Sequence, residues 1–314
     1  MSTVMTVTGP LPSDQLGFTL IHEHVFLDLT RDLFGRNSML NDPELAYMEL
    51  MRYKNAGGVT VVDQTTGGLR GHDHDILPEK HAIAVRRMAE RTGLNIVLGA
   101  GWYREPYYEQ RLYRMKTDQI AEELVKDITV GIDGTDVRAG LLGEIGAHYT
   151  WLSPVEERVL RAVARAHKST GLTVATHASN WSVGLDQLDI LEEEGVDPRR
   201  VVIGHCQSHP HHDYHAEIAR RGAFVSFDRM GTTKTYEHDT AVQHIRQMID
   251  AGLARHVLVS QDVCFREDYV AYGGNGYDYV PGALRGVLSD LGMTDQQFHE
   301  ITVDNPRCAL TGED

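Results

Sequence analysis

The sequence contains little cysteine, with three residues among 314. An odd and sparse number excludes a disulfide framework and is typical of a reducing compartment. No apolar run approaches the ~20 residues that a membrane-spanning helix needs. The N-terminal segment MSTVMTVTGPLP also lacks the basic and apolar regions of a secretion signal. These absences lead us to expect a soluble protein of the cytoplasm.

Positive charge is scarce as well. The chain has 30 Lys and Arg against 45 Asp and Glu, which gives a net charge of −15 with histidine neutral. A protein that binds a nucleic-acid backbone or an anionic membrane usually presents a basic face. We therefore expect neither nucleic acid nor membrane as a partner. The absence of a Gly-x-Ser-x-Gly motif also argues against a serine esterase.

Short β-rich apolar runs alternate with segments of helical period along most of the chain. This alternation is typical of an α/β protein with a parallel sheet, and eight strands at this length indicate a closed (β/α)8 TIM barrel. No low-complexity linker divides the chain, so we predict one barrel domain over residues 1–314. The predicted strands are Gly17–Ile21, Val59–Asp63, Asn95–Ala100, Ala139–Ile145, Leu172–Thr176, Val201–Gly204, Ala223–Phe227 and Val257–Ser260.

The clearest helix is predicted over Pro154–Thr170. Ser153 can cap its first turn, Pro154 suits its first position, and Gly171 ends it. Two further helices are predicted to close the chain, near Pro281–Leu291 and Thr294–Val303.

Histidine is abundant, with 17 residues, and six ligand-type side chains stand where predicted strands end. In a barrel the carboxyl ends of all strands meet at one face, where function concentrates. Residues two apart in an extended segment point to the same side, so His22 and His24 enter this face together while Glu23 points away. The six candidates are His22, His24, Glu144, His177, His205 and Asp262.

Imidazole and carboxylate ligands suit Zn²⁺, Mn²⁺, Fe²⁺ or Co²⁺, and we take Zn²⁺ as the first choice. Six ligands exceed the three protein ligands of a mononuclear catalytic zinc site. Two divalent metal ions that share a bridging carboxylate fit this set better. The pattern therefore predicts a binuclear metal site at the carboxyl ends of the strands.

The segments that carry these candidates resemble the phosphotriesterase family of the amidohydrolase superfamily, and in particular its phosphotriesterase-homology branch. The resemblance runs from about residue 7 to about residue 310. It is carried by Leu16–His24, Gly143–Gly146, Ala175–His177, Val202–Cys206, Leu258–Asp262, Gly273–Tyr279 and Asn305-Pro306.

The resemblance implies a role for each candidate ligand. His22, His24 and Asp262 would hold the more buried ion, the two later histidines would hold the more exposed one, and Glu144 would bridge both. Phosphotriesterases proper use a carboxylated lysine as the bridge, so Glu144 places the chain in the homology branch and weakens the case for phosphotriesterase activity. We expect a bridging hydroxide to attack a lactone or other carboxylic ester, with Asp262 as the catalytic residue that takes its proton.

Four further residues are predicted to bind substrate. Tyr103 follows the third strand, where related lactonases place a tyrosine, and Arg229 follows the seventh, similar to an arginine of those relatives. Lys234 and Arg266 lie in the loops after strands seven and eight. Cations around the mouth of an acidic protein indicate a small-molecule ester or lactone that is anionic. The resemblance also implies a homodimer.

Other interpretations remain open. Amide (N-acyl) hydrolysis and weak phosphotriester hydrolysis suit the same site, and a different class would be a metal-containing ligand-binding protein without significant turnover. A second His-x-His pair, His72 and His74, is expected in a surface loop. The role of the His209–His215 cluster stays undecided from the sequence.

Overall fold

Eight parallel strands form the centre of the computed structural model, which describes residues 2–71, 76–179, 181–232 and 235–313. Their order in the sheet follows their order in the chain, and β3 and β12 stand at its two ends. The Asp262 amide donates to the His22 carbonyl (3.1 Å), and the His22 amide donates to Ser260 Oγ (3.0 Å), so these ends meet. The strands are β3 (Thr19–Glu23), β6 (Thr60–Asp63), β7 (Asn95–Ala100), β8 (Leu141–Gly146), β9 (Val174–His177), β10 (Val201–Gly204), β11 (Phe224–Phe227) and β12 (Val257–Val259).

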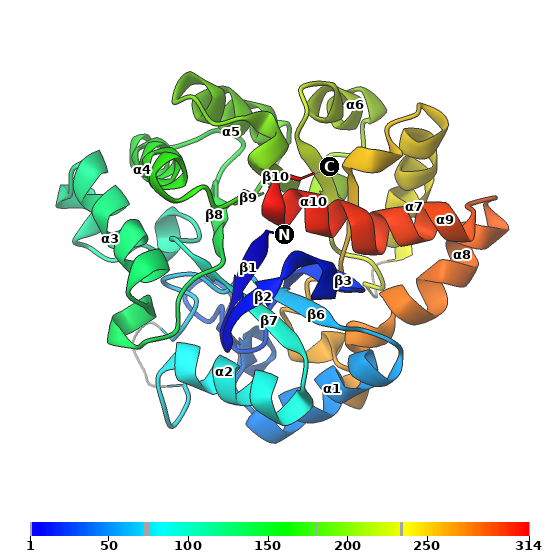
Figure 1. Ribbon diagram of the computed structural model, residues 1–314, viewed down its shortest axis with the longest axis horizontal. Helices are drawn as coiled ribbons and strands as arrows, with labels where there is room; N and C mark the ends of the chain where they lie inside the picture. The colour runs from blue at the N-terminus through cyan, green and yellow to red at the C-terminus, as the bar shows by residue number, and fades with distance from the viewer. Residues whose placement is uncertain (1, 72–75, 180, 233–234, 314) are drawn as a thin grey trace.

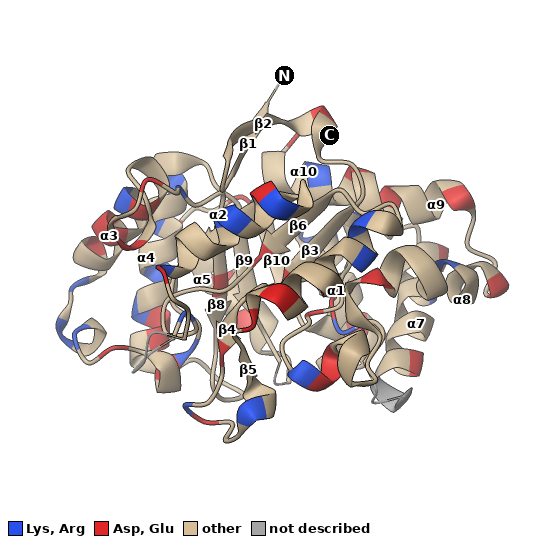
Figure 2. Ribbon diagram, turned by 90° about the horizontal axis from the view of Figure 1, so that it is seen from below, with Lys and Arg blue, Asp and Glu red and all other residues tan. Residues whose placement is uncertain are grey.

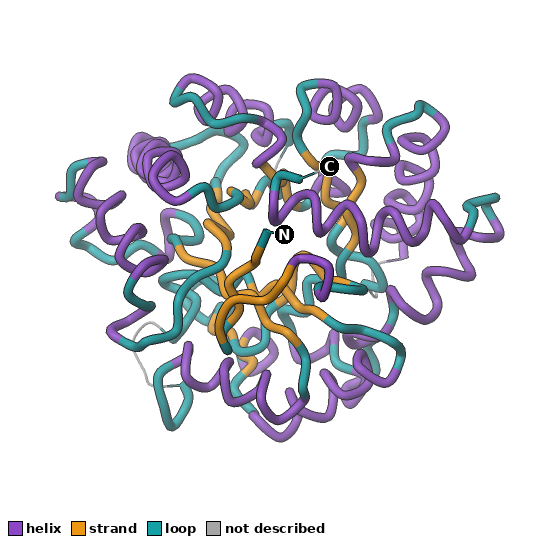
Figure 3. The backbone as a smooth tube through the Cα atoms, in the orientation of Figure 1, coloured by secondary structure: helices purple, strands orange, loops and turns teal. Residues whose placement is uncertain are grey.

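Helices surround this sheet, and Figure 3 shows the strands inside a ring of helices. In α4, Ser153 accepts from the Glu156 amide and Gly171 adopts a left-handed φ of 74°, as the sequence predicts. The predicted (β/α)8 TIM barrel is thereby confirmed. The helices around it are α1 (Pro43–Asn55), α2 (His81–Thr92), α3 (Thr117–Thr129), α4 (Pro154–Thr170), α5 (Val183–Glu193), α6 (His212–Arg220), α7 (Thr235–Asp250) and α8 (Arg285–Asp290).

Apolar side chains fill the inside of the barrel. Each strand contributes one of them: Ile21, Val62, Val97, Leu141, Ala175, Val202, Phe224 and Leu258. The N-terminal hairpin β1 (Thr3–Thr6) and β2 (Gly9–Pro12) and the helix α10 (Asn305–Thr311) cover this core at the amino ends of the strands (Figure 1). That end of the barrel is therefore sealed by packing.

The sequence did not predict this seal. The strands of the hairpin are short and contain two prolines, so they give little strand signal. The helix α10 continues from α9 (Asp295–His299) through a π-helical turn, Glu300–Asp304. The predicted helix near Thr294–Val303 is therefore only the first part of a longer helical segment. In the described residues, no helix is long and apolar enough to span a bilayer.

The opposite end of the barrel carries the longer connections. The segment after β3 forms the antiparallel pair β4 (Leu27–Asp28) and β5 (Met39–Leu40). Figure 2 places β4 and β5 at the end of the molecule opposite to β1, β2 and α10. The carboxyl ends of the barrel strands open toward these connections, so chemistry-bearing side chains at the strand ends gather here.

Candidate metal centre

The end of β3 supplies two imidazole rings to the face predicted from the sequence. His22 and His24 are both buried, and their ring centroids lie 5.6 Å apart. Glu23 between them is also fully buried, but its carboxyl group bonds to the segment after β12, at Ser260, Gln261 and Val263. The expected alternation of the His-Glu-His segment is therefore what the structure shows.

Glu144 lies at the centre of the candidate ligands. Its Oε1 is 3.6 Å from His22 Nε2 and 3.0 Å from His205 Nε2, and it also contacts His177 Nδ1. Its Oε2 is 4.0 Å from His24 Nε2. One carboxylate thus faces nitrogen atoms from β3, β9 and β10, which is the arrangement that a bridging ligand requires.

Asp262 completes the set on the side of β3. Its Oδ1 is 3.3 Å from His24 Nε2 and 3.9 Å from His22 Nε2. Its backbone adopts a φ of 46°, the left-handed region that residues with side chains seldom occupy. The structure therefore brings all six predicted ligands together.

The donor set fits divalent metal ions. The Nε2 atom of His22 is buried and has no hydrogen-bond partner, although it points at a carboxylate. In two groups, each of three residues, the possible ligand atoms lie within 4.8 Å of one another, and the groups share Glu144. A metal ion at this place would provide the partner that this buried imidazole nitrogen lacks among the described residues. The groups are His22, His24 and Glu144, and Glu144, His177 and His205.

Asp228 is a residue of this site that the sequence analysis missed. It lies directly after β11 and accepts hydrogen bonds from His22 Nδ1 (3.1 Å) and His205 Nδ1 (2.8 Å). The His205 amide also donates to it. A carboxylate on the far nitrogen fixes the tautomer and ring orientation of a metal-binding histidine. The sequence signal that identifies Asp228 is an acidic residue at the end of a predicted strand, directly before the predicted substrate residue Arg229.

Replacing Asp228 by asparagine is expected to weaken the binding of both metal ions by about 10–100-fold, as for other partners of metal-binding histidines. Both ions are affected because Asp228 orients one ring from each group. Equilibrium titration with Zn²⁺ measures the metal affinity. Thermal unfolding of the metal-free protein measures the contribution of Asp228 to the stability of the fold. A variant that loses only thermal stability, with unchanged zinc affinity, would contradict the orienting role.

Charges determine the protonation of the centre. Burial by itself would lower the pKa of His22, but the carboxylates of Glu144 and Asp228 outweigh it and raise that pKa to about 9. The pKa of His205 is raised well above its usual value against burial, mainly by Asp228. Burial would raise the pKa of Glu144, but the rings of His177 and His22 hold it well below its usual range. Without metal, ionised carboxylates therefore keep protons on two rings.

Metal binding at neutral pH should release these protons, because a histidine must be deprotonated at the atom that binds metal. The raised pKa of about 9 keeps His22 protonated at neutral pH, and the raised pKa of His205 acts in the same direction, so protons are favoured over metal as the pH falls. Metal affinity is expected to decrease steadily from pH 8 to pH 6. Calorimetric titration in buffers of different ionisation enthalpy should show more than one proton released per chain. A binding enthalpy that is independent of the buffer would show that the rings are neutral before metal binds.

The predicted substrate residues separate into two groups. Tyr103 and Arg229 line a cavity of about 340 Å³ beside the candidate ligands. The Tyr103 hydroxyl is 3.4 Å from His177 Nε2, and Arg229 Nη1 donates to the carbonyl of Asp262 (2.7 Å). Arg266 instead donates to the Met39 carbonyl and the Asn41 side chain and does not line this cavity.

Several sequence predictions fall elsewhere. Lys234, His72 and His74 lie outside the described residues. In the His209–His215 cluster, the buried His215 ring contacts Phe227 and bonds to the Cys206 carbonyl (2.8 Å), and burial lowers its pKa to about 3. Among the residues that the structure describes, no three members of this cluster form a metal-binding group. His215 is therefore a packing residue of this cluster.

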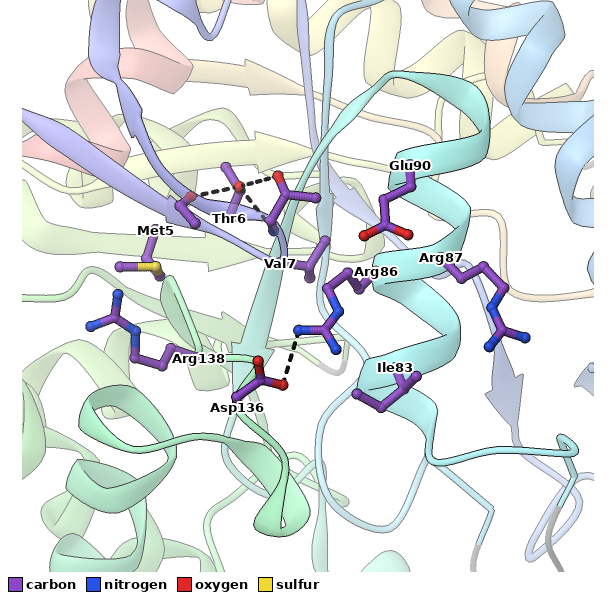
Figure 4. A pocket seen from close by; sticks show the side chains of 11 residues that line it. Met5, Thr6, Val7, Ile83, Arg86, Arg87, Glu90, Asp136 and Arg138 are labelled. Atoms are coloured by element: carbon purple, nitrogen blue, oxygen red, sulfur yellow. Dashed lines mark hydrogen bonds and ion pairs between the residues drawn. The ribbon is translucent and has the colours of Figure 1, made fainter.

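A larger cavity, of about 480 Å³, lies beside the N-terminal hairpin and α2 (Figure 4). Its charged side chains are partly matched, since Arg86 pairs with Asp136 (2.9 Å) and Arg87 pairs with Glu79 (2.8 Å). None of the six candidate ligands lines it. The candidate ligands therefore lie at the smaller cavity and not at this larger one.

Comparison with known families agrees with the strand-end motifs. The model of the phosphotriesterase family matches residues 2–310. The chain belongs to the phosphotriesterase family. The family predicted from the motifs is therefore confirmed, and membership supports a metal-dependent hydrolase.

Three proteins to which this chain is similar carry different names. The phosphotriesterase homology protein of Escherichia coli K12 is 31% identical over 93% of this chain and 97% of its own. An N-acetyltaurine hydrolase of Dictyostelium discoideum is 26% identical over 98% of this chain and 97% of its own. The crystal structure of a lactonase from Listeria monocytogenes covers 100% of both chains, with a TM-score of 0.88 and 25% identity. Ester and amide cleavage thus both occur among the relatives.

Proposed function

We propose that this chain is a binuclear metal-dependent hydrolase that cleaves a lactone or other carboxylic ester. The observation that carries the proposal is Glu144, whose carboxylate faces imidazole nitrogens from three strands at once. The residues that would hold the ions are His22, His24, Glu144, His177, His205 and Asp262. Two divalent ions at such a site would activate a water between them and polarise the substrate carbonyl oxygen.

Asp262 is the residue that we assign to proton transfer. Burial would raise its pKa, but hydrogen bonding to His24 and the charge of Arg229 lower it below the usual value. The carboxylate is therefore ionised at neutral pH and able to accept a proton. Arg229 Nη1 contacts both the carbonyl oxygen and Oδ2 (3.4 Å) of Asp262. These contacts hold the Asp262 side chain in one orientation at the cavity wall.

Tyr103 is proposed to contact the substrate. Burial raises the pKa of its hydroxyl well above the usual value, so the phenol stays protonated and can donate a hydrogen bond to an ester oxygen. Leu29, Leu33 and Phe265 give the cavity an apolar wall. An ester or lactone with an apolar substituent matches this lining.

The charge of the substrate is less constrained than the sequence indicated. Among the described residues that line the cavity, Arg229 is the only Lys or Arg, and it also contacts Asp262 and Asp268. Arg266 lies away from the cavity. An anionic substrate would therefore depend mainly on Arg229 within this part of the structure.

A hydrolysis screen of the metal-loaded protein tests the proposal. The panel should include sugar lactones, acyl lactones, aryl esters, N-acyl amino acids, N-acyltaurines and aryl phosphotriesters. We expect the highest kcat/KM for a lactone or carboxylic ester. Activity confined to N-acyl compounds would replace the ester assignment with amide hydrolysis, which the similarity to an N-acetyltaurine hydrolase makes the second candidate. Metal binding without turnover on any class would contradict the proposed function.

A further inference from the structure

Glu23 is a fully buried carboxylate for which the proposed function gives no role. It stands between His22 and His24 but projects to the other side of β3, toward β12 and the segment that follows it. Its Oε1 accepts from Ser260 Oγ (2.7 Å) and from the Gln261 amide (2.7 Å). Its Oε2 accepts from the Val263 amide (2.9 Å). Both oxygens are thus used, and all three donors lie within four consecutive residues.

These donors surround Asp262 in the sequence. Glu23 holds the amides of the residues directly before and after it, and the Asp262 amide itself donates to the His22 carbonyl (3.1 Å). Three successive amides are therefore bonded to β3. Ser260 adds a fourth link, because its hydroxyl accepts from the His22 amide (3.0 Å) while it donates to Glu23.

These four links between β3 and the residues around Asp262 are called the clamp below. The backbone conformation of Asp262 explains why the clamp is needed. Its φ of 46° is a conformation that residues with side chains leave unless their surroundings hold them in it. The Glu23 carboxyl group accepts hydrogen bonds from the amides of both flanking residues, Gln261 and Val263, so it is placed to fix the direction in which the Asp262 side chain points.

We propose that Glu23 is a positioning residue that holds Asp262 in the metal centre. It would couple the strand that carries His22 and His24 to the segment that carries the third ligand of the same ion. This inference rests on the proposed function, since it concerns the placement of a ligand and proton acceptor assigned there. A glutamine at this position would turn an N–H group toward a donor and lose at least one of the three bonds.

Glu49 offers a matched control on α1. It is also buried, and its carboxylate accepts from the amides of Val270 (3.2 Å) and Ala271 (2.9 Å). Those amides belong to the same segment after β12, but neither flanks Asp262. The Glu49→Gln variant therefore removes a comparable buried contact without touching the clamp.

The experiment compares Glu23→Gln and Glu49→Gln with the unaltered chain. The measurements are thermal unfolding of the metal-free protein, equilibrium titration with Zn²⁺ alone, and kcat and KM on the best ester from the screen. Both variants are expected to unfold at a lower temperature. Only Glu23→Gln should bind zinc about 10–100-fold more weakly, as for other residues that support metal ligands, and lose kcat rather than KM. Zinc affinity and kcat that match those of Glu49→Gln would overturn the proposal.

A second variant covers a failure of Glu23→Gln to fold. Ser260→Ala removes one donor to Glu23 and the partner of the His22 amide, and it should weaken zinc binding in the same direction by a smaller factor. Unchanged zinc affinity in a folded Ser260→Ala protein would contradict the clamp. If the proposed function fails, the unaltered chain binds zinc but hydrolyses no ester. The zinc affinities of the variants can still be compared with that of the unaltered chain, so the two failures are distinguishable.

Discussion

Replacing Asp262 by asparagine is expected to lower kcat by about 10²–10⁴-fold, the range that a positioned general base contributes. Asparagine keeps an oxygen in the place of Oδ1, which lies 3.3 Å from His24 Nε2, so zinc should still fill the site at saturating concentration, although with a lower affinity. It cannot accept the proton that the ionised carboxylate is proposed to take. KM should change less than kcat, because the lost interaction belongs to the transition state.

Asp28→Asn is the matched control for this variant. Asp28 is buried beyond the end of β3, and its carboxylate accepts only from the amide and hydroxyl of Thr30 among its described contacts. The control should retain kcat and zinc binding, with at most a small loss of thermal stability. If Asp262→Asn kept the kcat of the unaltered protein while binding the same amount of zinc, another group would have to accept the proton.

Replacing Glu144 by glutamine should have the other large effect. The amide offers one oxygen and an NH₂ group, so it cannot bridge two ions while facing rings from β3, β9 and β10. Zinc content is expected to fall from two ions per chain to one or none. Loss of the pair should reduce kcat/KM by about 10³-fold, since metal activation supplies several kcal/mol and ~1.4 kcal/mol corresponds to a factor of ten.

Glu156→Gln controls for the loss of a buried carboxylate near the same strand. Glu156 follows β8 on α4 and accepts from the amides of Glu105, His148 and Ser153. Its replacement should destabilise the fold but leave the zinc content unchanged. A Glu144→Gln protein that still binds two ions and turns over substrate normally would remove the bridging role.

The sequence was sufficient for the fold, which follows from periodicity, and it indicated a first set of candidate ligands from their positions at the ends of the predicted strands. Strand and helix alternation predicted the barrel, and β7 and β10 have the predicted bounds. The ends of the strands then indicated six side chains that the structure brings together, with Glu144 at their centre. Motif resemblance added the bridging role of this residue, which spacing alone did not assign.

The residues that support this set were harder to predict because their partners are distant in the sequence. Asp228 acts on His22 across 206 positions, and the carboxylate of Glu23 acts on segments some 240 positions away. Arg266 illustrates the same limit, since its position in a loop predicted a contact with substrate, whereas its guanidinium bonds to the Met39 carbonyl and the Asn41 side chain in this structure. Loop side chains depend on local packing, which a pattern of strands does not specify.

Metal content is the most direct test of the central claim. The protein should be stripped with a chelator, reconstituted with Zn²⁺, desalted and analysed by plasma mass spectrometry together with the Glu144→Gln variant. The proposed centre predicts close to two ions per chain for the unaltered protein and one or none for the variant. A reconstituted, folded protein that holds no zinc, or the same zinc content in both proteins, would contradict a binuclear centre bridged by Glu144.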